Sequence, residues 1–172
     1  MSCLGVFFAI DEKTTDTLIK MDRQYIVNYI QGEIEEIYFG EYKSQVAEIG
    51  KAWDAIQRAF SESECEVGII KGSYPSNMII LGGRILYGDK DGEEDYIISL
   101  KNYTEVAAIY EFLSGLNKAE FRELYYKIDK DKYGFDVDEQ DFEHTWEWLS
   151  GTVEFWRNAM DKQLSVIFTV DQ

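Results

Sequence analysis

The stretch "HTWEWLSGTVEFW", residues 144–156, holds three of the chain's four tryptophans, a phenylalanine and its only histidine. It lies within a helix that the sequence predicts over residues 139–162. A helix turns by about 100° per residue, which brings one set of large apolar side chains of this segment onto a single line. These residues are Phe142, Trp146, Leu149, Val153, Trp156 and Met160. The pattern predicts a helix that packs its apolar line into the core of a folded domain.

A second apolar line on the same helix is formed by Trp148, Phe155 and Ala159, about 120° away from the first. Three explanations fit such a line. It packs beneath another segment of the chain, it is a surface for a partner or a second copy, or it is one wall of a small-molecule cleft. Trp148 and Phe155 are therefore the candidate interaction patch. His144 falls on the polar side of the helix.

Length and composition indicate a single domain over residues 1–172. The chain is 45% hydrophobic and 15% aromatic, and it has one proline and no repeat or low-complexity linker. Cys3 and Cys65 have the spacing of neither a metal site nor a disulfide framework, which favours a cytoplasmic protein with reduced thiols. The opening "MSCLGVFFAI" predicts a strand and no signal peptide, and no apolar run is long enough for a transmembrane helix.

Helical and strand patterns both occur, with helices in the majority. Helical patterns cover residues 12–21, 23–39, 51–60, 103–116, 118–128 and 139–162. Strand patterns cover residues 4–10, 78–88 with a turn at Gly82-Gly83, 96–100 and 163–170. We expect a loop or short turn over residues 40–50, "GEYKSQVAEIG".

Two N-x-x-E capping boxes mark helix starts, Asn102 with Glu105 and Asn117 with Glu120. Helix pairs, and not single crossovers, separate the strands. This predicts an α+β fold with a mixed or antiparallel sheet of about four or five strands, packed by about five or six helices. The strands at the two chain ends are expected to pair near the middle of the sheet.

The charge restricts the partners that the surface can take. The net charge is -16, from 33 acidic and 17 basic residues. Such a surface repels nucleic-acid backbones and anionic membranes, so no nucleic acid or membrane is expected as a partner. A basic protein would be attracted. The same acidity also keeps a small protein soluble without any partner.

The sequence shows no set of residues typical of catalysis or of cofactor or metal binding. His144 has no nucleophile with a recognisable motif, and "LGGRILYG" lacks the features of a phosphate-binding loop. Residues 129–140, "DKDKYGFDVDEQ", imitate a calcium loop, but Tyr133 and Gln140 stand where oxygen ligands are needed. The acidic turn "GDKDGEED", residues 88–95, suits adventitious cation binding only. We expect no cofactor and no metal.

Several motifs in a fixed order resemble a known family. Lys51-Ala-Trp53 opens a helix, Gly82-Gly83 follows, and then come "TEVAAIYEFL" and "TVEFWRNAM" with "LSVIFTV". Across essentially the whole chain this order is similar to the YfbM-like proteins, a bacterial domain of unknown function (1877). The family pattern has histidines where this chain has Asp54 and Gln57. The resemblance implies a bacterial cytoplasmic protein with one domain of α/β type, and it implies no reaction.

The sequence thus favours a non-enzymatic binding or protein-interaction domain, a monomer or weak homodimer, whose partner is a basic protein. An antidote to a basic toxin is one form of this hypothesis. Mimicry of nucleic acid by rows of acidic side chains is a separate hypothesis. The alternative is a small-ligand-binding protein or an enzyme. Its cleft would lie near polar and aromatic residues at the ends of predicted elements, namely Lys51, Trp53, Asp54, Arg84 and Tyr87.

Overall fold

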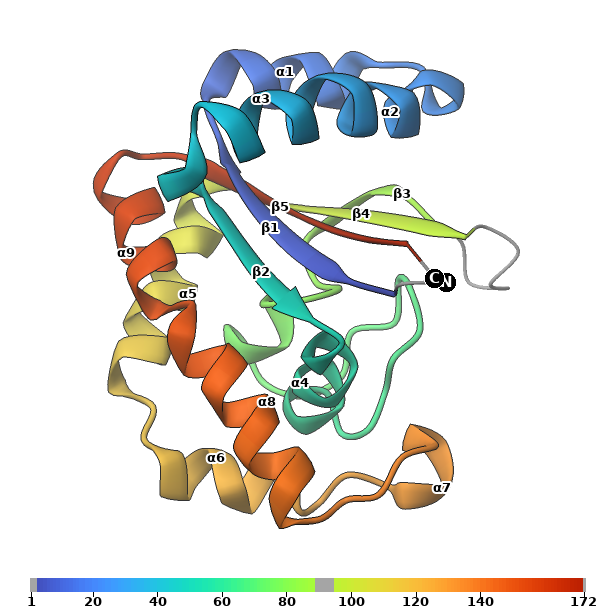
Figure 1. Cartoon of the computed structure of the whole chain (residues 1–172), viewed down its shortest axis with the longest axis vertical. Helices are drawn as coiled ribbons and strands as arrows, with labels where there is room; N and C mark the ends of the chain where they lie inside the picture. The colour runs from blue at the N-terminus through green and yellow to red at the C-terminus, as the bar shows by residue number, and fades with distance from the viewer. Residues whose placement is uncertain (1–2, 89–94, 172) are drawn as a thin grey trace.

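The computed structural model describes residues 3–88 and 95–171. Its centre is a five-stranded sheet of order β2-β1-β5-β4-β3, in which every neighbouring pair is antiparallel (Figure 1). The strands are β1 (Gly5–Ile10), β2 (Val46–Gly50), β3 (Arg84–Tyr87), β4 (Tyr96–Lys101) and β5 (Ser165–Asp171). Helices cover both faces of the sheet. The fold is therefore a single α+β domain, as the sequence predicts.

The strands at the two chain ends pair in the middle of the sheet. Their register runs from Gly5 opposite Val170 to Ile10 opposite Ser165. Phe7 and Phe8 point to opposite faces of β1, and both are fully buried. A strand with both faces buried needs apolar residues at successive positions, which explains the unbroken apolar run at the start of the chain.

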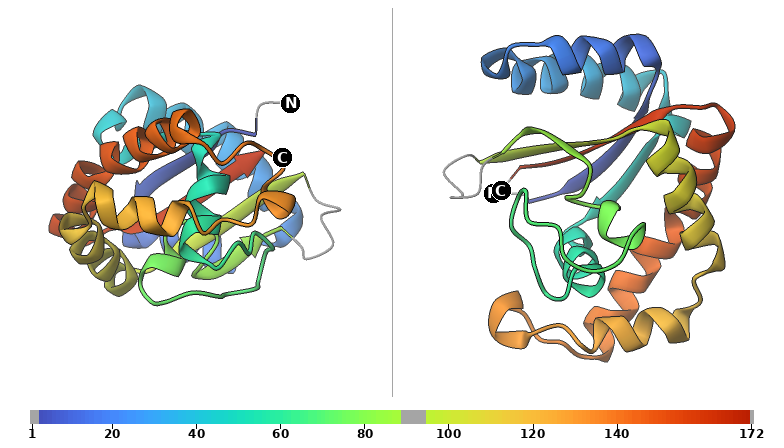
Figure 2. Two further views of the ribbon diagram at one scale, coloured as in Figure 1. Left: turned by 90° about the horizontal axis from the view of Figure 1, so that it is seen from below. Right: turned by 180° about the vertical axis from the view of Figure 1, so that it is seen from behind.

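One face of the sheet is covered by the helices that follow β1 (Figures 1 and 2). They are α1 (Glu12–Lys20), α2 (Arg23–Tyr29), the π-helical turn η1 (Ile30–Ile34) and α3 (Glu35–Gly40). Asp11 caps α1 by accepting from the backbone N–H of Thr14. The helix predicted over residues 23–39 is divided by η1. There the backbone hydrogen bonds join residues five apart, instead of four apart as in an α-helix.

The other face carries the larger helical layer, seen below the sheet in Figure 1 and from behind in Figure 2. Its elements are α4 (Ala52–Phe60), η3 (Ser76–Met78), α5 (Tyr103–Gly115), α6 (Lys118–Tyr125), α7 (Lys130–Tyr133), α8 (Glu139–Gly151) and α9 (Val153–Asp161). A further 3-10 turn, η2 (Lys43–Gln45), leads into β2. No helix among the described residues has the length and apolar character needed to cross a membrane.

The helical segments of the described ranges outnumber the five or six expected. Two predicted helices are split, at η1 and at Thr152, and α7 forms inside a predicted loop. The buried Thr152 hydroxyl donates to the carbonyl of Leu149 at the junction of α8 and α9. A side chain that bonds to the preceding turn commonly bends a helix.

The predicted core line of residues 139–162 packs inward. Phe142, Leu149 and Trp156 are almost fully buried. The other members, Trp146, Val153 and Met160, are half-buried and pack against the same core. The assignment of this helix to the core is confirmed.

The prediction for residues 40–50 was wrong, because Val46–Gly50 forms strand β2. The segment is short and has no local strand signal beyond one alternation, and pairing with β1 determines its conformation. The expected strand over residues 78–88 was only half right. Residues 78–81 are buried without joining the sheet, and β3 begins after Gly82-Gly83.

The glycine pair is a tight turn, as expected. Gly83 has φ +92°, and a Cβ placed there would lie 2.3 Å from the carbonyl oxygen of Leu100. Only glycine fits this close approach of the turn to β4.

Candidate functional site

An open groove of about 680 Å³ lies between β2 and helices α8 and α9. We call it the edge groove. One wall is β2 itself, and the other carries Trp148 together with polar and acidic side chains. Glu48 lies on β2, whereas His144, Glu147 and Glu154 lie on the wall formed by α8 and α9.

β2 is the outermost strand of the sheet on this side. One side of its backbone therefore has no neighbouring strand among the described residues. Unpaired N–H and C=O groups along an edge strand are a template for a further strand. Val46, Ala47 and Glu48 line the groove, so the groove follows three successive residues of this edge strand.

Trp148 is the aromatic side chain at the centre of the site. It is half-buried, and its Nε1 donates a hydrogen bond to Nε2 of His144 at 3.1 Å. Its ring lies over the end of β2, where a Cβ on Gly50 would be 3.4 Å from Cζ2. Gly50 has φ +56°, so both its backbone conformation and its close contact favour glycine. Strand and helix are thus closely packed at this point.

A second, smaller pocket of about 380 Å³ shares Trp148 and Glu48 with the edge groove. Two further carboxylates line it, Glu35 from α3 and Asp171 from β5. We call it the carboxylate pocket. Phe39 and Tyr96 add aromatic walls.

Glu35 is an acid of this pocket whose pKa is raised. Burial raises its pKa, a hydrogen bond from the hydroxyl of Tyr96 to its Oε1 at 3.1 Å acts in the opposite direction, and the charge of Asp171 raises it further. Burial also raises the pKa of Tyr96, so its hydroxyl stays protonated and able to donate. Partial desolvation and a neighbouring like charge both disfavour a lone carboxylate.

The predicted interaction patch is only partly accessible. Phe155 is 6% exposed and stacks on Phe7 with ring centroids 6.0 Å apart. Both residues line the edge groove, but Trp148 is only half-buried and keeps more exposed surface. Trp148 and Phe155 therefore do not form one exposed stripe, and Trp148 alone can serve as a surface anchor.

The five residues of the predicted cleft do not come together. Trp53 is buried in the core beneath the larger helical layer, whereas Tyr87 packs on the opposite face of the sheet. Lys51 and Arg84 are exposed, at the start of α4 and on the edge strand β3. The sheet therefore separates Trp53 from Tyr87.

Two of these residues have defined partners elsewhere. The indole Nε1 of Trp53 donates to the carbonyl oxygen of Cys3 at 3.1 Å. The ring of Tyr87 lies 4.6 Å from the guanidinium carbon of Arg23. Both contacts hold the ends of elements in place.

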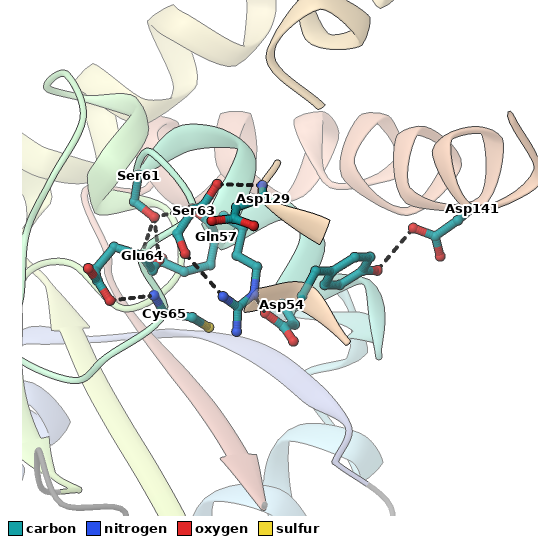
Figure 3. A network of polar contacts seen from close by, with 10 residues as sticks. Asp54, Gln57, Ser61, Ser63, Glu64, Cys65, Asp129 and Asp141 are labelled. Atoms are coloured by element: carbon teal, nitrogen blue, oxygen red, sulfur yellow. Dashed lines mark hydrogen bonds and ion pairs between the residues drawn. The ribbon is translucent and has the colours of Figure 1, made fainter. Parts of the chain in front are cut away.

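Asp54 belongs to a polar network that ties α4 to the loops around it (Figure 3). It pairs with Arg58, whose Nη1 donates to the carbonyl of Ser63. The hydroxyl of Ser63 accepts from the backbone N–H of Asp129 at 2.8 Å. This arrangement fixes the end of α4 against the start of α7.

Cys65 lies in the same network (Figure 3). Burial, with the nearby charge of Asp54, raises the pKa of its thiol. A protonated thiol is a poor nucleophile. His144 is engaged with Trp148 in the edge groove, so the two residues do not form a Cys-His pair.

The loop that imitates a calcium site is organised by its own side chains. Asp129 caps α7 by accepting from the backbone N–H of Asp131, and the hydroxyls of Tyr125 and Tyr133 donate to Asp141. Within residues 3–88 and 95–171, no three His, Cys, Asp or Glu side chains are grouped to hold a metal ion. Residues 89–94 of the acidic turn lie outside these ranges.

Sequence reasoning missed both the edge groove and the carboxylate pocket, although it singled out Trp148. Glu35, Glu48 and Asp171 stand far apart in the chain with no motif around them. The one available signal was the alternation around Glu48, which is typical of a half-buried strand.

Comparison with known proteins supports the fold. Residues 1–169 match the family described as Domain of unknown function (DUF1877). The crystal structure of YfbM, a protein of unknown function from Escherichia coli, is similar over 97% of this chain and 99% of that one, with a TM-score of 0.62 and 16% identity. Among curated proteins no match is found. On the strength of the family match over nearly its whole length, the chain belongs to the DUF1877 family.

Proposed function

We propose that this protein is an interaction domain that binds an extended, positively charged segment of a partner protein along the free edge of β2. The observation that carries the proposal is the coincidence of three features in the edge groove. An edge strand, an accessible tryptophan and carboxylates surround one open volume.

Strand addition is the binding mode that fits β2. A peptide added to an edge strand gains main-chain hydrogen bonds, and pockets beside the strand bind every second side chain of the peptide. The edge groove provides such a neighbouring surface, because α8 and α9 rise beside β2. Trp148 supplies the large aromatic contact that typically carries much of the energy of an interface.

Charge determines the kind of partner. Glu48, Glu147 and Glu154 line the groove, and no lysine or arginine is among its described lining residues. The whole chain adds a net charge of -16, which accelerates encounter with a basic protein. The same carboxylates disfavour pairing of β2 with a second copy, because like charges would meet. A basic toxin held inactive by this domain is one form that such a partner takes.

A designed peptide tests the proposal without knowledge of the partner. We expect a peptide of about ten residues that alternates lysine and valine to bind, and one that alternates glutamate and valine not to bind. Calorimetry gives the affinity, and amide NMR shifts should concentrate in β2, α8 and α9. N-methylation of alternate peptide bonds should abolish binding, because it removes the donors needed for strand addition.

Two charge reversals distinguish the contribution of the groove to peptide affinity from that of the overall negative charge. Glu147→Lys lies in the groove, whereas Glu111→Lys is exposed on α5 and makes the same change in net charge. We expect a larger loss of affinity for Glu147→Lys. Equal losses, or no binding of the lysine-valine peptide to the wild-type protein, would overturn the proposal. Self-association with shifts confined to β2 would also overturn it, in favour of a homodimer.

A further inference from the structure

The carboxylate pocket adjoins the edge groove at the end of β2, and the two share Glu48 and Trp148. A segment that runs along the strand therefore passes the mouth of the pocket near Gly50. This continuity raises the question of which side chain of the segment the pocket would accept.

The pocket combines aromatic walls with carboxylates. Phe39, Tyr96 and Trp148 contribute rings, and Glu35, Glu48 and Asp171 contribute negative charge. No lysine or arginine is among the described residues that line it, and none of the three acids forms an ion pair within residues 3–88 and 95–171. Like charges held together without a counter-charge destabilise one another, and a bound cation relieves this cost.

We infer that this pocket binds the guanidinium group of an arginine side chain carried by the partner's segment. The inference rests on the proposed strand addition to β2. A guanidinium is planar, donates several hydrogen bonds in one plane and stacks on aromatic rings. It can therefore contact the rings of the pocket and donate to its carboxylates at the same time. The pocket has a volume of about 380 Å³, which accommodates an organic cation, and the described residues hold no group of three acids suited to a metal ion.

Glu35 is the residue best placed to hold the cation. The hydroxyl of Tyr96 donates to its Oε1, which fixes the carboxylate and leaves Oε2 to accept from a ligand. The raised pKa of Glu35 agrees with this geometry, because burial and Asp171 disfavour its lone negative charge. A guanidinium beside it would reverse that effect.

Arginine and citrulline provide the sharpest comparison, since citrulline has nearly the same shape without the charge. We expect the lysine-valine peptide with one arginine opposite the Gly50 end of β2 to bind about tenfold more tightly than its citrulline counterpart. N-acetyl-arginine amide alone should bind weakly and shift the amides of Glu35, Gly50 and Asp171. N-acetyl-citrulline amide should leave these amides unchanged.

Matched variants locate the effect. Glu35→Gln should remove the preference for arginine over citrulline, whereas Glu36→Gln, on the exposed side of the same helix, should keep it within about twofold. Far-UV circular dichroism and the thermal midpoint check that both variants are folded. Tyr96→Phe should weaken the preference for arginine, because it removes the hydrogen bond that fixes Glu35.

The outcomes separate the two proposals. Equal binding of the arginine and citrulline peptides, or an arginine preference that survives Glu35→Gln, overturns the assignment of the pocket and leaves strand addition standing. Binding of N-acetyl-arginine amide that depends on Glu35, with no binding of any extended peptide, supports the guanidinium pocket and overturns strand addition.

Discussion

The three tryptophans of residues 144–156 have three different environments. Trp156 is fully buried against Phe7, with ring centroids 5.1 Å apart. Trp146 is half-buried on Phe121, and Trp148 faces the edge groove. The same residue type therefore serves the core, the edge of the core and the surface within four helical turns, according to its angle around the helix.

Trp156→Ala should reduce the free energy of unfolding by about 3–5 kcal/mol, because it leaves a large cavity in the core. Urea unfolding measures the loss. Trp156→Phe is the control and should cost less, since it keeps an aromatic ring and removes an indole N–H that has no hydrogen-bond partner among the described residues. An unchanged unfolding midpoint for the alanine variant would contradict the core assignment.

Lys101 is an unusual member of the core, since it is fully buried on β4. Its Nζ donates to the Ser99 hydroxyl and to the carbonyl oxygen of Ile80. Burial lowers the pKa of Lys101, and the charge of Glu105 only partly opposes this. Removing a buried amine from water destabilises its charged form.

Lys101→Met should raise the free energy of unfolding at pH 7 and weaken its pH dependence in the alkaline range below about pH 10, the usual pKa of lysine. The folded-state pKa lies below the unfolded one, so the unfolded chain binds more protons in this window. The stability of the wild type therefore rises with pH there, and the methionine variant lacks this contribution. The carbonyl of Ile80 keeps a donor, because the Ser99 hydroxyl also bonds to it. Urea unfolding at several pH values decides the matter, and a less stable variant with an unchanged slope would contradict the expectation.

Among the elements, α5 and α6 begin as the sequence predicts. Asn102 and Asn117 each accept from the backbone N–H three residues on, and Glu105 and Glu120 bond back to the cap. Each box thereby satisfies two backbone N–H donors at the start of its helix. Each box depends only on residues within four positions of one another, so distant contacts do not alter it.

Asn117→Ala should lower the free energy of unfolding by about 1 kcal/mol, because it removes the side-chain acceptor of the cap. Asn117→Asp keeps the acceptor and is the control, with an expected change well below that of alanine. Urea midpoints compare the two. Equal losses would show that the cap contributes nothing and that the position is sensitive for another reason.

β2 is the element on which the proposed function depends, and it is also the least predictable. Its residues lie in a polar segment between helices, and its partner β1 is far away in sequence. An edge strand such as β2 forms only when the neighbouring strand, here β1, is in place to pair with it. Its outer side then stays free for a further strand.

At the scale of the whole molecule, the charge dominates. The chain of 172 residues has a net charge of -16, so its acidic side chains repel one another in the folded state. Salt screens this repulsion beyond about 8 Å at physiological ionic strength. Any association with a basic partner should weaken under the same conditions. Salt should therefore stabilise the fold while it weakens the complex.

The thermal midpoint of the free protein should rise as NaCl increases from about 10 to about 150 mM. Association with the lysine-valine peptide should slow over the same range, mostly through its on-rate. Differential scanning calorimetry and stopped-flow fluorescence measure the two effects. Near pH 5, close to the sequence pI of about 4.4, the salt dependence of the midpoint should shrink. A midpoint that falls with salt at pH 7 would contradict this account.

The sequence by itself determined the features that depend on near neighbours along the chain. The core line through Phe142 and Trp156, the two capping boxes and the apolar strands at both ends follow from periodicity and local hydrogen bonding. The pairing of the end strands also followed, since such strands are stable only beside another strand.

Only the tertiary structure decided which surfaces remained free. Phe155 packs on Phe7 and is almost fully buried, whereas Trp148 stays half-buried in the edge groove, although both belong to one line of the predicted helix. Likewise, Glu35, Glu48 and Asp171 line one pocket only because the start of α3, strand β2 and the end of β5 lie close together in the fold. Contacts between elements distant in sequence depend on how the layers pack, and a local pattern of residue types carries no information about that.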